Sequence, residues 1–291
     1  MKRSDSLMAD THARHVLSDS GPDYSLDSAL HLSRYTWASE QHGSGVSVAV
    51  DLGCGTGFGV SALRRAGISR VVGIDLQPTG KINDIGTELI TANLCEPQLA
   101  QELGLDGIAQ LIVSMETIEH LEDYFTFVEN AAAMLADGGV VVIGTPNRTM
   151  TYNRYPGRRH MDPSHVQEFT PVALVHVLGE FFAEVELWYQ LLPSALPLRP
   201  VDLPAAPSGF RSRVIRYAKN VGAALASPIR SRMPRDLGPA PTYRLDQVTF
   251  TRGDVDSTEA LTAFCLLAVC RLPGSRARET GSQLSARQCA E

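Results

Sequence analysis

The segment SMETIEHLED places two carboxylates and an imidazole within five positions, at Glu116, Glu119 and His120. A later segment, RRHMDPSHVQEFT, adds another imidazole at His165. An imidazole titrates near neutral pH and can take a proton from a substrate hydroxyl. Two carboxylates and two imidazoles also form a ligand set that suits Mn, Co, Fe or Zn better than Ca. These residue types could therefore supply a general base or a metal site.

Three interpretations of this cluster follow from its residue types. In the first, His120 acts as a base or orients the substrate, with His165 beside it. In the second, a divalent cation positions vicinal hydroxyls and lowers the pKa of the attacking one. The ligands of that cation would be Glu116, Glu119, His120 and His165. In the third, Glu119 and His120 only organise their loop, and Glu116 faces a cofactor.

The chain alternates between apolar runs typical of buried strands and periodic runs typical of helices. Strands are predicted in seven runs: GVSVAVDLG, RVVGIDL, ELITANL, AQLIVSM, VVVIGTPN, AEVELWYQLL and LTAFCLLAVCRL. Helices are predicted at 25–42, 59–67, 123–139 and 170–182. The last helix opens with Thr170 as its cap and Pro171 at its first position. This alternation predicts an α/β fold with a doubly wound, mainly parallel sheet.

The predicted sheet brings the candidate reactive residues to the carboxyl ends of its strands. SMETIEHLED follows the fourth strand, and the segment with His165 follows the fifth. Both segments therefore lie at carboxyl ends of strands, where ligands of open α/β sheets bind. If a helix begins in the first segment, its two glutamates and His120 share one face. We expect both segments to border one site.

The run VAVDLGCGTGFG places Gly53, Gly55 and Gly57 at a turn from strand to helix. Glycines there let the backbone approach a ligand, and the helix N-terminus offers free N–H groups. Asp51 precedes the loop, where its carboxylate repels a pyrophosphate and can pair with an ammonium group. Asp75 ends the next strand, where a carboxylate can accept both hydroxyls of a ribose. The pattern predicts a ligand with a ribose and an ammonium but no diphosphate.

The segments VAVDLGCGTG, VVGIDL and LADGGVVVIGTPN resemble the class I S-adenosylmethionine-dependent methyltransferases. The resemblance covers residues 26–190 and resumes at 259–272. It implies a seven-stranded Rossmann-like sheet, with S-adenosyl-L-methionine as methyl donor and S-adenosyl-L-homocysteine as product. It also implies that the loop from Gly53 to Gly57 approaches the methionine part of the donor and that Asp75 holds the ribose.

Other donor contacts are predicted by position. Asn93 stands where the family often has an Asp that bonds the adenine amine, and an Asn oxygen can accept the same bond. Arg34 is a candidate for the donor's carboxylate. The full set of predicted donor contacts is Arg34, Asp51, Gly53, Gly55, Gly57, Asp75, Leu76, Asn93, Leu94 and Glu116.

Two narrower resemblances concern the acceptor. METIEHL with the later HVQEFT is similar to the small-RNA 3′-end 2′-O-methyltransferases, which use two Glu and two His as metal ligands. EHL followed by Asn147 and Arg148 is similar to the ubiquinone-pathway O-methyltransferases. HLSRYTWA, METIEHLED and GTPNR together resemble a broader bacterial group in which several members modify sugars or natural products.

Composition and charge bound the remaining questions. The chain has 291 residues, a net charge of −6 and five cysteines without paired spacing, which we expect to be reduced. Residues 211–235 hold seven Lys or Arg and no acid, which leaves 19 basic against 32 acidic residues elsewhere. An acidic body argues against a nucleic-acid partner. No apolar leader and no run of eighteen apolar residues is present, so we expect a cytoplasmic protein without a transmembrane segment.

The sequence also suggests how the chain is divided. We expect a disordered arm at 1–25, a methyltransferase core at 26–190 and the end of that core at 246–272. Residues 191–245 are rich in proline and contain the basic run, which predicts an insertion that acts as a lid or substrate region. A disordered tail is predicted at 273–291. No feature of the sequence specifies an oligomeric state.

The predicted function is O-methylation of a small hydroxylated acceptor, such as a sugar or a glycosylated natural product. His120 would act as base or orienter and His165 would face the acceptor, with positioning of the two reactants supplying much of the rate. Three alternatives stay open. They are a metal-dependent O-methyltransferase of a phenol or an RNA 3′ end, N-methylation of an aminosugar, and a non-catalytic module that binds S-adenosylmethionine.

Overall fold

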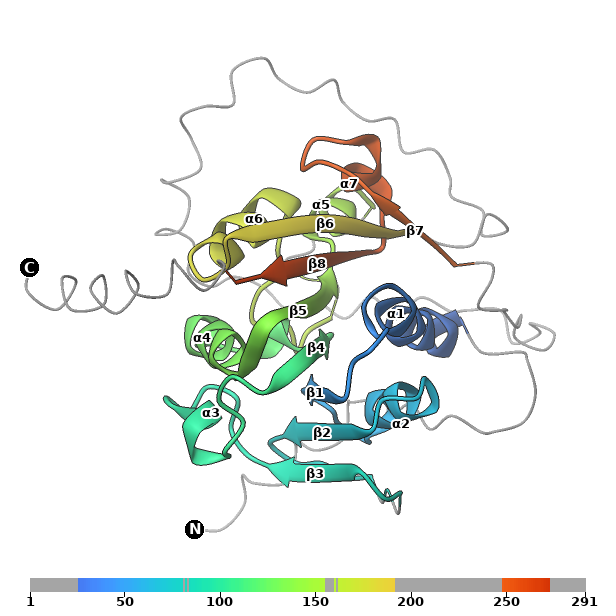
Figure 1. Ribbon diagram of the computed structural model, residues 1–291. Helices are drawn as coiled ribbons and strands as arrows, with labels where there is room; N and C mark the ends of the chain where they lie inside the picture. The colour runs from blue at the N-terminus through green and yellow to red at the C-terminus, as the bar shows by residue number, and fades with distance from the viewer. Residues whose placement is uncertain are drawn as a thin grey trace, which may run out of the picture.

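The computed structural model describes residues 26–80, 82, 84–154, 160, 162–191 and 248–272. The arm predicted at 1–25 and the tail predicted at 273–291 lie outside these residues. So does nearly all of the insertion predicted at 191–245, including the basic run. The described residues form one sheet with helices on both faces (Figure 1).

Within the described ranges, the sheet has eight strands in the order β3-β2-β1-β4-β5-β8-β6-β7. The first five strands of this order pair in parallel, and β8, β6 and β7 pair antiparallel. The strands are β1 (Val48–Leu52), β2 (Arg70–Asp75), β3 (Thr87–Thr91), β4 (Ala109–Met115), β5 (Leu135–Pro146), β6 (Glu184–Leu191), β7 (Thr249–Arg252) and β8 (Cys265–Arg271). This is the predicted α/β arrangement.

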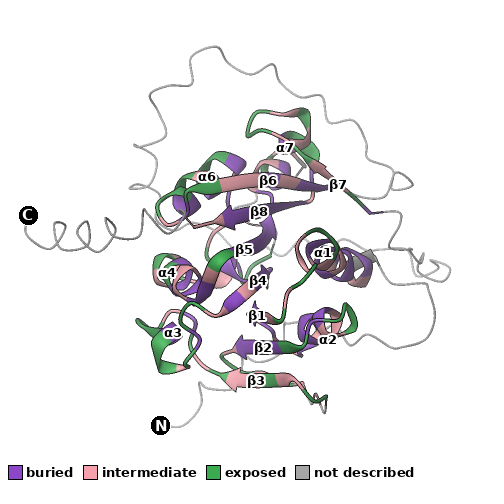
Figure 2. Cartoon of the chain, viewed as in Figure 1, coloured by how far each residue is buried: buried purple, intermediate pink, exposed green. Residues whose placement is uncertain are grey.

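Helices cover the two faces of the sheet and bury an apolar layer on each side (Figure 2). One layer includes residues of α1 (Leu26–His42) and α2 (Phe58–Arg65). The other includes residues of α3 (Leu99–Glu102), α4 (Tyr124–Met134) and α6 (Pro171–Gly179). Two short helices, α5 (Arg148–Arg154) and α7 (Thr258–Thr262), contact each other. None of the described helices is both long and apolar enough to cross a membrane.

The residues at helix starts explain where two of these helices begin. Thr170 caps α6, because its side chain accepts a hydrogen bond from the backbone N–H of Ala173, and Pro171 occupies the first turn. Asp123 caps α4 in the same way through the N–H of Thr126. These bonds satisfy N–H groups that have no partner within the helix. The predicted cap of α6 is confirmed.

Three expectations about elements were wrong. The run LTAFCLLAVCRL was predicted as one strand, but Leu261 and Thr262 belong to α7 and β8 begins at Cys265. The sheet has an eighth strand, β7, whose residues TFTR pair only with β6 at the sheet edge and carry no continuous apolar run. The helix predicted at 123–139 ends at Met134, and Leu135 already pairs with Ala109 as the start of β5. Gly138 has a φ of 72°, which lies outside the conformation of an α-helix.

The strand order brings two segments together at the carboxyl end of the sheet. Asp51 on β1 pairs in register with Val113 on β4, so both strands end at the same level. The sheet runs outward to β2 on one side of β1 and to β4 on the other, which makes this the switch point where open α/β sheets bind ligands. The hydroxyl of Thr117 donates to the carbonyl of Leu52 at 3.3 Å. The glycine loop after β1 and the chain after β4 are therefore neighbours.

Candidate active site

The glycine loop after β1 depends on backbone conformations that other residues rarely adopt. Gly53, Gly55 and Gly57 have φ values of 84°, 50° and 77°. A Cβ on Gly53 would lie 2.2 Å from Oγ1 of Thr117, and one on Gly57 would lie 2.6 Å from Cδ1 of Ile82. Beside Gly55 the space is open, with no atom of the described residues within 4 Å of such a Cβ. The loop therefore packs closely at its ends and leaves room at its centre.

Asp75, at the end of β2, holds this loop. Its Oδ2 accepts a hydrogen bond from the N–H of Gly55 at 2.9 Å, and its Oδ1 accepts one from the N–H of Gln77 at 2.8 Å. Each carboxylate oxygen can accept a second hydrogen bond. Asp75 is therefore beside the open centre of the loop with acceptor capacity on both oxygens.

Asp51 is fully buried at the end of β1. The hydroxyl of Tyr35 donates to its Oδ1 at 3.1 Å, while its Oδ2 has no hydrogen-bond partner among the described residues. Burial raises the pKa of Asp51 to about 7; the Tyr35 bond opposes this rise and the charge of Asp75 adds to it. A nearby cation would favour the ionised form of this carboxyl.

The other predicted donor contacts lie along the ends of β2 and β3. Leu76 is 65% exposed, although it directly follows Asp75. Asn93 is exposed, and its Oδ1 accepts a hydrogen bond from the N–H of Cys95 at 3.1 Å. Leu94 is buried in the core. Asn93 thus already uses one acceptor position within its own turn.

Glu116 follows β4 with a φ of 53°, a conformation that is rare for residues other than glycine. Its Oε1 accepts a hydrogen bond from Arg34 at 2.6 Å, and Arg34 is only 1% exposed. The Nε of Arg34 donates to Oε1 of Gln190 at 2.8 Å. Two predicted donor contacts, Arg34 and Glu116, are thus joined in a buried network with β6.

Glu119 lies in a short 3-10 turn, Ile118–His120, and its side chain is fully buried. The hydroxyl of Thr145 donates to its Oε2 at 2.9 Å, whereas its Oε1 has no hydrogen-bond partner among the described residues. Burial raises the pKa of Glu119 well above its ordinary value, and the carboxylate of Glu116 adds to the rise. An unpaired buried carboxyl oxygen is costly unless a proton, a cation or a ligand satisfies it.

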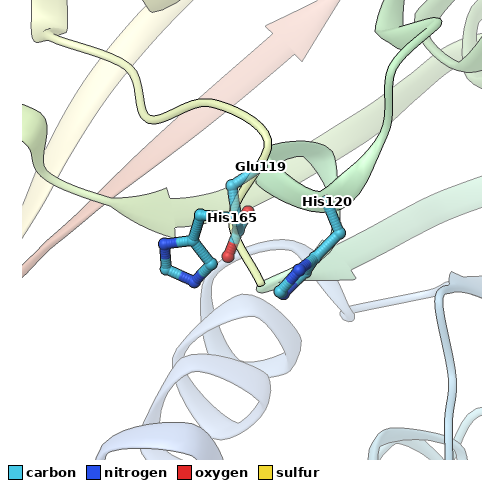
Figure 3. Close-up of side chains that lie close together, drawn as sticks. All are labelled: Glu119, His120 and His165. Atoms are coloured by element: carbon cyan, nitrogen blue, oxygen red, sulfur yellow. The ribbon is translucent and has the colours of Figure 1, made fainter. Parts of the chain in front are cut away.

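Two imidazoles flank this carboxylate. Ligand atoms of Glu119, His120 and His165 all lie within 4.8 Å of one another. Figure 3 shows the carboxylate of Glu119 between the two rings. The ring centroids of His120 and His165 are 4.9 Å apart, at an interplanar angle of 76°. The structure thus brings three of the four predicted metal ligands together, and Glu116 is paired with Arg34 instead.

Hydrogen bonds at Nδ1 orient both rings. Nδ1 of His120 lies 3.3 Å from the carbonyl oxygen of Ser164, and Nδ1 of His165 lies 2.8 Å from Oε1 of Glu168. The carbonyl of Ser164 can only accept, so this contact places a hydrogen on Nδ1 of His120 and, in the neutral ring, the lone pair on Nε2. The partner of His165 is a carboxyl oxygen, and it contacts Nδ1 of that ring, not Nε2. The arrangement gives each ring a nitrogen able to take a proton or bind a metal.

The loop that carries His165 is tied to the turn that carries Glu119. The carbonyl of Glu119 accepts hydrogen bonds from the N–H groups of Val166 and Gln167 at 2.9 and 3.1 Å. These bonds join the segment after β5 to the segment after β4. The expectation that both segments border one site agrees with this geometry.

Several supporting residues were not predicted. Thr145 and Gln190 are polar residues inside apolar strands, which is the signal that could have identified them. Asn147 is buried, and its amide donates to the carbonyls of Ala260 and Ala263, so it fixes α7 against the end of β5. Nothing in the local sequence indicates the partners of Asn147 or the pairing of Gln190 with Arg34, because these partners lie more than a hundred residues away.

Comparisons with known proteins agree with this architecture. A family model described as "Methyltransferase domain" matches residues 31–184, more than half of the chain. The chain is 29% identical over 138 residues to a probable S-adenosylmethionine-dependent methyltransferase of Mycolicibacterium smegmatis, covering 47% of this chain and 52% of that protein. It is 36% identical over 104 residues to a ubiquinone biosynthesis O-methyltransferase of Methylobacterium sp. (strain 4-46), covering 35% and 41%. The chain therefore spans about half the length, or less, of these relatives.

Among solved structures, the chain is similar to a SAM dependent methyltransferase from Archaeoglobus fulgidus, with a TM-score of 0.45 and 18% identity. That match covers 55% of this chain and 72% of the other. The family match itself spans the glycine loop, Asp75, and the turn with Glu119 and His120. The chain belongs to the methyltransferase-domain family, and its predicted membership in the S-adenosylmethionine-dependent methyltransferases is confirmed.

Proposed function

We propose that this protein transfers a methyl group from S-adenosylmethionine to a hydroxyl of a small molecule. One observation carries the proposal: Glu119, His120 and His165 form a cluster within 4.8 Å at the same sheet edge as the glycine loop. Family membership supports the donor, and the cluster supports a reaction that needs a proton acceptor. We also propose the cytoplasmic location and the division of the chain that the sequence predicts.

The residues around the glycine loop fit the donor. Gly55 leaves open space at the loop centre, and Asp75 beside it retains acceptor positions for two ribose hydroxyls. The unpaired Oδ2 of buried Asp51 fits the charge of an ammonium group. We assign the exposed Leu76 and Asn93 to the adenine end. When bound, S-adenosylmethionine supplies a methyl group activated by its sulfonium.

The histidine pair serves the acceptor in this proposal. His120 removes the proton of the attacking hydroxyl or orients that hydroxyl, and His165 stands beside it. With Nδ1 donating to the carbonyl of Ser164, His120 keeps the lone pair of Nε2 for this task. Holding acceptor and donor in line at the same edge supplies a large part of the rate.

The acceptor class is inferred from a relative's name, from sequence motifs and from charge. One of the relatives is named for ubiquinone biosynthesis O-methylation, which favours oxygen as the methylated atom. The motifs resembling the sugar-modifying bacterial group favour a sugar or a glycosylated natural product. The acidic body of the chain argues against RNA. N-methylation of an aminosugar and donor binding without turnover are outcomes that the experiment below distinguishes.

The test uses donor carrying a labelled methyl group with pools of sugars, phenols, aminosugars and short RNA. We expect label in a hydroxylated small molecule, loss of transfer in His120→Ala, and retained binding of S-adenosylhomocysteine in that variant by calorimetry. Asp75→Ala should lose that binding. Label in RNA alone or in an amine, or no label in any pool, would contradict the proposed acceptor.

A cation-assisted reaction is a second candidate, because the buried carboxylate of Glu119 lies between two imidazoles (Figure 3) and its Oε1 has no hydrogen-bond partner among the described residues. Glu119, His120 and His165 would hold the ion, a ligand set that suits Zn, Mn, Fe or Co. Such an ion would lower the pKa of a bound hydroxyl. Calorimetry with Zn²⁺ or Mn²⁺ tests this directly: binding to the native chain that Glu119→Gln abolishes supports it. Absence of binding, together with transfer that a chelator does not change, eliminates it.

A further inference from the structure

The His165 side chain contacts a buried glutamate that the proposed reaction does not use. Glu168 lies three residues after His165, its side chain is fully buried, and its Oε1 is 2.8 Å from Nδ1 of His165. Its other oxygen, Oε2, lies 3.8 Å from NH1 of Arg148. A buried carboxylate between a guanidinium and an imidazole can fix the orientation of the imidazole ring.

We propose that Glu168 is a positioning residue that fixes the tautomer and orientation of His165. This inference rests on the proposed function, since His165 faces the acceptor there. By accepting the Nδ1 hydrogen, Glu168 keeps the lone pair of His165 on Nε2, the nitrogen left to join the cluster with Glu119 and His120. The same orientation serves a base and a metal ligand, so the inference holds for either candidate reaction.

The surrounding backbone shows why the glutamate can hold this position. The N–H of Arg148 donates to the carbonyl of Phe169 at 2.9 Å, and Asn147 bridges to Phe169 in parallel. The residue after Glu168 is thus attached to the end of β5, which also places the Arg148 side chain beside the carboxylate. The N–H groups of Val166 and Gln167 attach the other side of the loop to Glu119. Glu168 sits between two anchored points.

Arg148 has a defined part in this arrangement. Its guanidinium is about one quarter exposed, whereas the carboxylate it faces is fully buried. The two oxygens of the carboxylate face different partners, with Oε2 toward the guanidinium of Arg148 and Oε1 toward Nδ1 of His165. Arg148 acts on His165 only through Glu168.

The direct test reads the tautomer by NMR. In full-length protein labelled with ¹⁵N-histidine, at mildly alkaline pH and with a chelator present, we expect Nδ1 of His165 to be protonated and Nε2 unprotonated. His165→Gln assigns the signals. In Glu168→Ala we expect a mixture of both tautomers. A native ring protonated at Nε2, or an unchanged tautomer in the variant, overturns the proposal without reference to activity.

Kinetics supply the second readout. We expect Glu168→Ala to lower kcat about 10- to 100-fold with KM for the methyl donor unchanged. Glu88→Ala is the matched control, because Glu88 also pairs with an arginine, Arg70, but lies on β3 and is exposed. It should leave kcat unchanged. A Glu168→Ala kcat within twofold of native contradicts the proposal. If native protein shows the expected tautomer but no methyl transfer, the proposed function fails and this inference stands.

Discussion

The guanidinium of Arg34 and the carboxylate of Glu116 form a hydrogen-bonded ion pair of 2.6 Å that joins α1 to the carboxyl end of β4. Arg34 is buried and Glu116 mostly so, and Arg34 also donates to Gln190 on β6. Glu116 also has a left-handed backbone conformation, with a φ of 53°. One buried cation thus connects the first helix, the switch-point strand and the antiparallel part of the sheet.

Removing this cation should be costly. We expect Arg34→Ala to lower the free energy of unfolding by about 3–5 kcal/mol, because it leaves the carboxylate of Glu116 and the amide oxygen of Gln190 without the guanidinium that donates to them. Urea titration measures the change. Arg70→Ala is the control: its pair with Glu88 is 3.7 Å long and exposed, and its loss should cost about 0–1 kcal/mol. Equal losses in the two variants would show that the Arg34 pair has no special role.

Asp51 should make stability depend on pH. Its pKa is raised to about 7 in the folded chain and is close to 3.8 when unfolded. The folded state therefore binds the proton more tightly, so this contribution is full below about pH 4 and is lost as pH rises through about 7. As pH rises between these limits, we expect the unfolding free energy of the native chain to fall relative to that of Asp51→Asn. Urea titration at several pH values measures both. The exposed Asp106→Asn should track the native chain; a constant difference between native and Asp51→Asn would refute the prediction.

Two Gly→Ala variants separate the cost of backbone strain from the cost of a steric clash. Gly53→Ala combines a φ of 84° with a Cβ 2.2 Å from Oγ1 of Thr117, whereas Gly67→Ala meets only the strain of a φ of 96°. We expect about 1–2 kcal/mol of destabilisation from strain in both variants and about 1–3 kcal/mol more in Gly53→Ala. Thermal unfolding measures stability, and calorimetry with S-adenosylhomocysteine should show weakened binding only for Gly53→Ala. Comparable stability of the two variants would mean that Thr117 moves aside at no cost.

Glu119 should show a conflict between stability and activity. Because burial raises its pKa, the folded state binds this proton more tightly than the unfolded state, so the stability that the carboxyl contributes at low pH is lost as pH rises. Glu119→Gln removes the titrating group, and its amide oxygen can still accept the hydroxyl of Thr145. We expect unfolding free energy at pH 8 to rise by about 1 kcal/mol and methyl transfer to fall at least tenfold. The exposed neighbour Glu122→Gln should change neither quantity; full activity in Glu119→Gln would remove Glu119 from the site.

Much of this architecture follows from local pattern. The apolar runs that became β1, β2 and β4 are short and end in glycine or an acid, so their strand character and carboxyl ends are readable along the chain. Thr170 and Pro171 correctly predicted where α6 begins. Where pattern failed, local geometry explains it. β7 is an edge strand without an apolar run, and Leu135 leaves the helical conformation to pair with Ala109 in the sheet.

The sequence by itself determined the set of reactive residues and their place at the carboxyl end of the sheet. The order of strands and turns places Gly53, Asp75 and His120 at or just after the carboxyl ends of strands. Only the tertiary structure decided which of them touch. Glu119, His120 and His165 meet, while Glu116 turns to Arg34, a partner 82 residues away. Glu168 gains its orienting position from anchors on β5 and on the turn at Glu119. Such pairings depend on burial and on distances between segments that are remote in the chain. Neither quantity can be predicted from the spacing of residues along the sequence.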